Sequence, residues 1–305
     1  MSWDILVNIF FILCSIILSL ATLTECFYWY EYKNSTSSVF NNNKVAWWKL
    51  IWRVIETFVS WIVVYLMYPF VRLLAKPLVD KNGKKPPLIL VHGLFHNAST
   101  WFFYKLWFKK AGYTRVHLYS YPVHGKELWG LTKYLEKAVS EVESLYPGEK
   151  PILIGMSLGG LMIRGWMSET DPRVENRENG TTKTNHDRIR AVITLGTPHS
   201  GSKLAAFGIE KTSRSLSPSG PFFKELVAKE SITKSEWIPK IALYSLADNL
   251  VLPTDNLMPP SEWNKDTLPQ VTHVAMMLCK RTFNKMLGHL NKLPDNSNSF
   301  ENNNK

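Results

Sequence analysis

The chain has 305 residues, of which 45% are hydrophobic and 13% aromatic, so it can bury a sizeable core and global disorder is excluded. The formal net charge is +11, but the excess is spread along the chain. A nucleic-acid-binding face would need a basic stripe in register with aromatic residues. The sequence shows no such stripe, and we expect no nucleic-acid partner.

Cysteine usage excludes two further classes of protein. The three cysteines have neither the even count of a disulfide framework nor the spacing of a zinc site. We therefore expect free thiols and no metal centre, and these thiols are Cys14, Cys26 and Cys279.

The first element in chain order is an uncharged apolar segment over residues 5–24. It has the length of about 20 residues that a helix needs to cross a bilayer. No Lys or Arg precedes it and no clean cleavage site follows, so the pattern favours an uncleaved membrane helix over a secretory signal. A second apolar segment covers residues 54–75. It either completes a membrane hairpin or lies in the interface or on the domain.

The distribution of basic residues predicts which way this anchor region, residues 1–78, is oriented. No Lys or Arg precedes the first segment, whereas a cluster follows the second. The positive-inside rule then places the rest of the chain on the cytoplasmic side. The cluster consists of Arg72, Lys76, Lys81, Lys84 and Lys85.

Beyond a linker at residues 79–86, strand and helix patterns alternate over residues 87–292, and residues 293–305 form a polar, low-complexity tail that we expect to be disordered. This alternation predicts a mostly parallel sheet with helices on both faces, with functional residues beyond the carboxyl ends of the strands. The expected strands are 87–93, 115–121, 150–155, 189–198 and 240–248, and the expected helices are 127–146, 158–169 and one that begins at 271. Four polar residues stand at such strand ends, namely His92, Ser157, His199 and Asp248.

Ser157 is the candidate nucleophile. It lies in the pentapeptide Gly155-Met156-Ser157-Leu158-Gly159, which fits the G-x-S-x-G pattern between a strand and a helix. So sharp a turn strains the central residue, and the flanking glycines let neighbouring backbones approach closely. The alternative is a plain turn, which would need no serine.

A serine hydroxyl attacks only when a base takes its proton and a carboxylate orients that base. Asp248 follows a predicted strand, and His273 precedes the last helix, in the order serine, acid, histidine. Asp255 is a rival acid, but it follows a proline-containing turn. Among the other histidines, we expect His289 to be a surface or packing residue of the last helix and His186 to be solvated in a polar loop. His199 could line the cleft without acting as the base.

The oxyanion of an acyl-transfer intermediate needs two N–H donors. We expect one at Leu158, directly after the nucleophile, and one at Leu94 in the loop after the first strand, with Phe95 as the alternative to Leu94. We expect His92 to be a structural residue of this loop.

At these residues the sequence resembles the α/β-hydrolase lipases and esterases, over about residues 86–290. The similarity rests on "LVHGLFHNASTW", "IGMSLGGLMIR", "VITLGTPHSGS" and "YSLADNLVLP" followed by "THVAMM". The element "GTPHSGS" is typical of bacterial triacylglycerol-lipase-like proteins and of the related GPI inositol-deacylases. The resemblance implies an α/β-hydrolase fold and ester hydrolysis through an acyl-enzyme, without a cofactor, on a triad of Ser157, Asp248 and His273.

The chain departs from that family in several features. The last strand before His273 is poorly marked. The secreted members have signal peptides, whereas we expect this chain to keep its apolar segment at residues 5–24. The paired aspartates that bind calcium in some members cannot be placed. Residues 200–238 occupy the position of a cap, which is either a lid that opens at a lipid surface or a fixed cap. Its apolar residues are Leu204, Phe207, Phe222, Phe223, Leu226 and Trp237. The predicted substrate-binding residues are Phe95, His199, Phe222 and Phe223.

The leading hypothesis is a membrane-anchored serine hydrolase that acts on lipid-like acyl esters, with the membrane and a lipid or acyl-ester substrate as its partners. One alternative is acyl transfer, or thioester or amide cleavage, on the same triad. The other is a catalytically silent hydrolase fold that serves as an interaction module.

Overall fold

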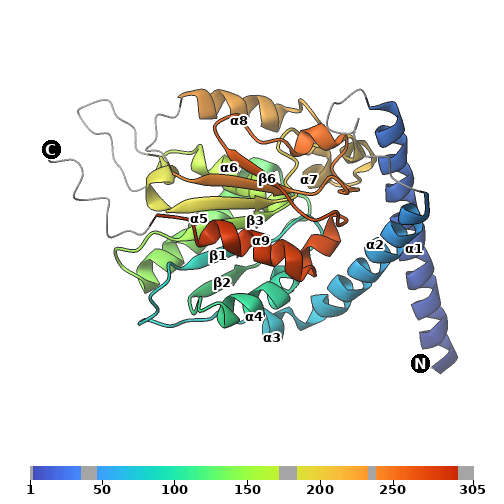
Figure 1. Ribbon diagram of the computed structural model, residues 1–305, viewed down its shortest axis with the longest axis horizontal. Coiled ribbons are helices and arrows are strands. Elements are labelled where there is room, and N and C mark those ends of the chain that lie inside the picture. The colour runs from blue at the N-terminus through green and yellow to red at the C-terminus, as the bar shows by residue number, and fades with distance from the viewer. Residues whose placement is uncertain (1–2, 36–46, 172–183, 233–237, 295–305) are drawn as a thin grey trace.

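The computed structural model describes residues 3–35, 47–171, 184–232 and 238–294 (Figure 1). Within these residues, six parallel strands form one sheet in the order β2-β1-β3-β4-β5-β6. The strands are β1 (Leu88–Val91), β2 (Val116–Tyr119), β3 (Ile152–Met156), β4 (Ala191–Leu195), β5 (Lys240–Tyr244) and β6 (Asn264–Thr267).

Helices cover both faces of the sheet, as predicted. Strand residues alternate between the two faces, so Ile89 and Val91 pack in one apolar cluster while Leu88 and Leu90 pack in the other. The first cluster includes side chains from α5 (Leu128–Leu145), α6 (Leu158–Met167) and α8 (Pro221–Ile232). The second includes side chains from α4 (Phe102–Lys110) and α9 (Lys280–Leu290).

The register brings the strand ends to one edge of the sheet. Val91, the last residue of β1, lies opposite Gly155 in β3, and Gly155 lies opposite Thr194 in β4. The loops that follow β1, β3, β4 and β5 therefore meet at the same edge, where sites form in parallel sheets.

The structure differs from the sequence-based expectation near the end of the chain. β6 was not among the expected strands; it is a polar edge strand whose residues are mostly exposed. The helix expected from residue 271 is divided into a 3-10 turn, Val274–Met277, and α9, with Leu278 and Cys279 between them. An extended backbone at Cys279 (φ −88°, ψ 111°) separates these two elements.

Two long helices precede the sheet. α1 (Trp3–Asn34) and α2 (Trp47–Met67) pack against each other, and a 3-10 turn (Tyr68–Phe70) and α3 (Val71–Leu74) follow. In Figure 1, α1 and α2 lie to one side of the strands, and the beginning of α1 projects away from the rest of the molecule.

Both helices have the length and composition of a membrane span, and α1 has those of a signal sequence as well. Only 6% of the most apolar 18-residue segment of α1 is buried, and 17% of that in the span Trp48–Leu74, which contains α2. Neither is therefore an ordinary core helix.

The segment between β4 and β5 contains a 3-10 turn (Lys203–Phe207), α7 (Lys211–Arg214) and α8. Of the residues that we expected in the cap, Trp237 lies outside the described residues, as does the tail from residue 295. Leu226 is fully buried in the apolar cluster of α5 and α6, so α8 packs as part of the helix layer.

Candidate active site

Ser157 lies between β3 and α6, in a conformation that few residues with a side chain adopt. Its φ is 55° and its ψ is −121°. Such a backbone is strained and persists only where the surroundings fix it. Here the Ser157 N–H donates to the Leu195 carbonyl at 2.8 Å, and the Thr197 hydroxyl donates to the Ser157 carbonyl at 3.1 Å.

The two glycines of the motif are required by close backbone contacts. A Cβ atom at Gly155 would lie 2.6 Å from the Gly160 nitrogen, and one at Gly159 would lie 2.3 Å from the Val91 carbonyl oxygen. Both distances are far below van der Waals contact. The sequence therefore forms this turn only with glycine at both positions.

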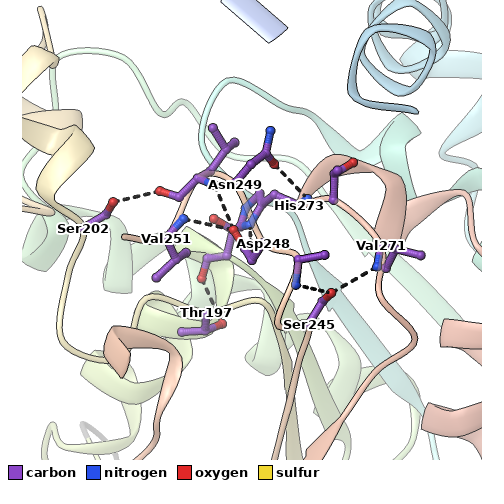
Figure 2. A network of polar contacts seen from close by, with 12 residues as sticks. Thr197, Ser202, Ser245, Asp248, Asn249, Val251, Val271 and His273 are labelled. Carbon is purple, nitrogen blue, oxygen red and sulfur yellow. Dashed lines mark hydrogen bonds and ion pairs between the residues drawn. The ribbon is translucent and has the colours of Figure 1, made fainter. Parts of the chain in front are cut away.

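Asp248 and His273 form a buried pair in the loops after β5 and before α9 (Figure 2). The Nδ1–H of His273 donates to Oδ2 of Asp248 at 2.6 Å. The other carboxylate oxygen of Asp248 accepts the N–H groups of Leu250 and Val251, each at 2.9 Å. With Nδ1 protonated, Nε2 of His273 is left as the basic nitrogen of the ring.

Hydrogen bonds from backbone N–H groups to two side-chain oxygens fix the two loops relative to each other. The Ser245 hydroxyl oxygen accepts N–H groups from both loops, from Ala247 and Val271, each at 3.1 Å. The side-chain oxygen of Asn249 accepts the N–H of His273 at 3.2 Å. The acid and the histidine are thus held by their backbones as well as by their own hydrogen bond, as Figure 2 shows.

Ser157 and His273 line one cavity of about 640 Å³. It has the size of a pocket for a ligand of several hundred daltons. Asp248 lies behind His273 and is fully buried. The structure thus brings together the three residues that we predicted as nucleophile, acid and base.

The loop after β1 passes directly against the serine. A Cβ atom at Gly93 would lie 3.1 Å from the Ser157 Cβ. A turn follows, in which the His96 N–H donates to the Gly93 carbonyl at 3.4 Å and Phe95 has a φ of 57°. Leu94 and Phe95 line the cavity. Leu158 begins α6, and the first N–H groups of a helix have no carbonyl partner inside it.

His92 holds this loop in place. Its ring stacks on Tyr121 with centroids 4.2 Å apart, and its Nδ1–H donates to the Gly93 carbonyl at 2.9 Å. The Tyr121 hydroxyl donates to the His92 carbonyl at 2.6 Å. Complete burial lowers the pKa of His92 to about 4, so the ring is neutral near pH 7.

His96 is a cavity residue that we did not single out from the sequence. It lines the same cavity as Ser157 and His273, and its buried Nδ1 has no hydrogen-bond partner among the described residues. Burial, with smaller contributions from His92 and His273, lowers its pKa to about 3. Its position four residues after His92 in "HGLFH" was the available signal, but a single histidine in a loop does not identify a cavity residue.

Three of the four predicted substrate-binding residues lie elsewhere. His199 is buried behind the site, where its carbonyl accepts from Arg164 at 2.8 Å and its ring contacts Thr194 at 3.2 Å. Phe222 and Phe223 belong to the apolar cluster of α5 and α6. None of the three lines the cavity, so the cavity gives their predicted role no support. Of the four predicted residues, only Phe95 lines it.

The rival residues are separate from the cavity. Asp255 is exposed, and His289 lies on α9, where it contacts Asp266 at 3.0 Å. The expectation of a solvated His186 was wrong, since this side chain is 5% exposed. It lies in a 3-10 turn (Asn185–Arg188), and burial lowers its pKa to about 4.

Much of the cavity wall comes from the predicted cap and from the two amino-terminal helices, whose part in the wall the sequence did not reveal. Residues 202–216 of the cap contribute one wall, and α1 and α2 contribute another. The cap residues of the wall include Leu204, Ala205, Phe207 and Leu216, and the helix residues include Leu20, Leu23, Phe27, Trp61, Val64 and Tyr65. No group of metal-ligating side chains occurs within the described ranges.

The fold agrees with a comparison against known families. The model of the alpha/beta hydrolase family matches residues 88–285. The chain therefore belongs to the alpha/beta hydrolase family.

Curated relatives are similar over a shorter stretch. "Probable esterase PIR7A" of Oryza sativa is 31% identical over 90 residues, which are 28% of this chain and 34% of that protein. "Methyl jasmonate esterase 1" of Vitis vinifera is 35% identical over 80 residues, which are 25% of this chain and 31% of that protein. The chain thus spans about a third of the length of the curated relatives it matches.

Solved structures show the same fold over more of the chain. The lipase BlEst2 of Bacillus licheniformis, in its mature form, is similar with a TM-score of 0.52 and 21% identity, over 71% of this chain and 96% of that one. A structure from a study of LipS and LipT, two metagenome-derived lipolytic enzymes, is similar with a TM-score of 0.50 and 15% identity, over 72% of this chain and 98% of that one.

Proposed function

We propose that the chain is a membrane-anchored serine hydrolase that cleaves carboxylic esters of lipid-like substrates through an acyl-enzyme. The observation that carries the proposal is the 2.6 Å contact between His273 and Asp248, beside a cavity that His273 shares with the strained Ser157. The esterases and lipases among the similar proteins support the same reaction class.

The proposed acylation step uses these three side chains together. The Ser157 Oγ attacks the ester carbonyl carbon while Nε2 of His273 takes the hydroxyl proton, and Asp248 stabilises the imidazolium that forms. The N–H groups of Leu158 and Leu94 hold the oxyanion. When the carbon–oxygen bond of the ester breaks, the imidazolium gives its proton to the departing alcohol, and Ser157 carries the acyl group.

Deacylation repeats these steps with water. His273 takes a proton from the attacking water molecule and returns it to the Ser157 oxygen as the acid leaves.

Membrane anchoring rests on the outer surfaces of α1 and α2. α1 has 32 residues, about 48 Å at 1.5 Å per residue, which exceeds the hydrocarbon core of about 30 Å. Its buried side chains, Ala21, Glu25 and Tyr28, all lie in its second half. The first half exposes Ile5, Phe11 and many other large apolar side chains. An exposed apolar surface of this kind favours lipid over water.

Turnover of p-nitrophenyl butyrate by the full-length protein in detergent tests the reaction. We expect hydrolysis by the parent and a loss of at least about 10³-fold in Ser157→Ala. A folded Ser157→Ala protein that keeps parental turnover would rule out the proposed nucleophile, and a folded parent that does not react with serine-directed probes would favour a silent interaction module.

Carbonate extraction of cell membranes tests the anchor. An integral protein stays in the membrane pellet at high pH, whereas release of the intact chain into the supernatant would overturn that part of the proposal.

A further inference from the structure

The two amino-terminal helices are joined to the site by polar contacts at several points. The Tyr28 hydroxyl of α1 and the Arg53 guanidinium of α2 donate to the carbonyls of Leu246 and Ala247, each at 2.8 Å. Arg53 also pairs with the buried Glu25 at 2.9 Å. These contacts fix both helices to the loop that carries Asp248.

The loop that carries His273 is held as well. A carboxylate oxygen of Glu56 accepts the N–H of Thr272 at 2.8 Å. The side-chain amide of Asn249 donates to the hydroxyls of Thr24 and Thr57, at 3.0 and 3.2 Å. The helices are therefore built into this side of the domain, and a flexible tether would make no such contacts.

Next to these polar contacts, the helices present apolar side chains to the cavity. Leu20, Leu23 and Phe27 lie three and four residues apart, so they share one face of α1. Trp61 and Val64 share one face of α2 in the same way. Without the helices, this side of the Ser157 cavity would lack its wall.

The same wall continues onto the outer surface of the protein. Phe27 of α1 stacks on Phe207 of the cap with ring centroids 5.1 Å apart. Phe207 is 68% exposed and the neighbouring Ile209 is 87% exposed, although both line the cavity. Leu20 and Leu23 likewise contribute both to the cavity and to the exposed apolar surface of α1. The same apolar side chains therefore belong both to the lining of the cavity and to the exposed apolar surface of α1 and the cap.

We infer that α1 and α2 form the acyl-binding wall of the active site, and that the substrate class is an ester of a long acyl chain that enters from the bilayer along these helices. The inference rests on the proposed function, because it assigns a substrate class to that same site. The volume of about 640 Å³ exceeds what a short acyl group fills. A long chain gains binding free energy in proportion to the apolar area that it buries.

The experiment compares kcat/KM for p-nitrophenyl palmitate and p-nitrophenyl butyrate, with the full-length protein in detergent micelles. Val64 is 1% exposed and lines the cavity, whereas Val59 on the same helix is 48% exposed and does not. We expect Val64→Trp to lower the palmitate-to-butyrate ratio by at least about tenfold, because the indole fills part of the cavity. The matched control Val59→Trp should leave both rates at the parental level.

A second variant covers the case in which Val64→Trp does not fold. Phe27 is half-buried, so its truncation removes part of the wall at little cost in packing. We expect Phe27→Ala to lower the same ratio about fivefold, mainly through KM for palmitate, since the chain loses an apolar contact. Phe11→Ala, at an exposed position that does not line the cavity, is its control.

The outcomes separate the two claims. A parent that hydrolyses neither ester contradicts the proposed function itself. A parent that hydrolyses both esters, with an unchanged ratio in folded Val64→Trp and Phe27→Ala, contradicts only the acyl-binding role of the helices.

Discussion

Asn249 accepts the backbone N–H of His273 on its side-chain oxygen at 3.2 Å. The residue directly after the candidate acid therefore fixes the backbone of the candidate base. The amide group of the same side chain donates to Thr24 and Thr57 on the two amino-terminal helices. One side chain thus connects the anchor region to the orientation of His273.

Replacing Asn249 should slow catalysis more than it weakens substrate binding. A buried, neutral hydrogen bond contributes about 1 kcal/mol, so we expect kcat of Asn249→Ala to fall about fivefold with KM near the parental value. Thr24→Val removes one helix contact and leaves the bond to His273 in place, so its kcat should stay within about twofold. Equal losses in the two variants, or a rise in KM alone, would contradict this positioning role.

The choice between the two candidate acids can be tested directly. Asp248 is fully buried against His273, while Asp255 is exposed in a 3-10 turn. Because an amide cannot hold the histidine in the required tautomer, we expect Asp248→Asn to lower kcat by about 10³–10⁴-fold. Asp255→Asn is the matched control, and its kcat should equal that of the parent. Comparable losses in both variants would show that the acid is wrongly assigned.

The glycine requirement of the turn at Ser157 makes a prediction about folding. A methyl group at Gly159 would meet the Val91 carbonyl oxygen at 2.3 Å, and rigid backbone cannot move aside cheaply. We expect Gly159→Ala to prevent folding or to lower the melting temperature by at least about 10 °C. A Cβ atom at Gly288 on α9 would meet nothing within 4 Å, so Gly288→Ala should stabilise by about 1 kcal/mol. Similar melting curves for the two variants would contradict the steric account.

Acid should destabilise the protein through histidines that are buried in the neutral form. Burial lowers the pKa of His186 from 6.5 to about 4. Between these two pH values the unfolded chain binds a proton that the folded chain does not, so stability is intact above pH 6.5 and falls as the pH drops towards 4. At pH 4.5 this one residue costs about 2 kcal/mol relative to pH 7.

Thermal unfolding of the full-length protein at pH 7 and at pH 4.5 measures this effect. We expect the loss of stability between the two pH values to be smaller in His186→Gln than in the parent. Taking the difference between pH values removes any cost of the substitution that does not depend on pH. An unchanged pH dependence would show that His186 is not held neutral.

The sequence predicted the sheet and the candidate triad because local patterns carry both. Ser157 was indicated by its glycines and its position between strand and helix, and Asp248 and His273 by chain order. β6 could not be predicted in the same way. Its residues are polar and mostly exposed because it is an edge strand, so it lacks the apolar run that marks a buried strand.

Tertiary packing decided the features that the sequence left open. Phe222 and Phe223 could have faced a cleft or a core. Both belong to the apolar cluster of α5 and α6, where the ring centroids of Phe222 and Trp129 lie 5.0 Å apart. The docking of α1 and α2 on the loop after β5 depends on partners far away in the chain, such as Tyr28 and Leu246. Composition identified these helices as apolar, but it could not show that they line the cavity of Ser157.

The central claim, that Ser157 is a nucleophile activated by His273, is tested most directly by labelling the folded protein with a fluorophosphonate and locating the adduct by peptide mass spectrometry. We predict one adduct, on Ser157, whose formation is slowed by at least about 10³-fold in His273→Ala. A folded protein that acquires no adduct, or one that is labelled at Ser157 equally fast without His273, would contradict the account.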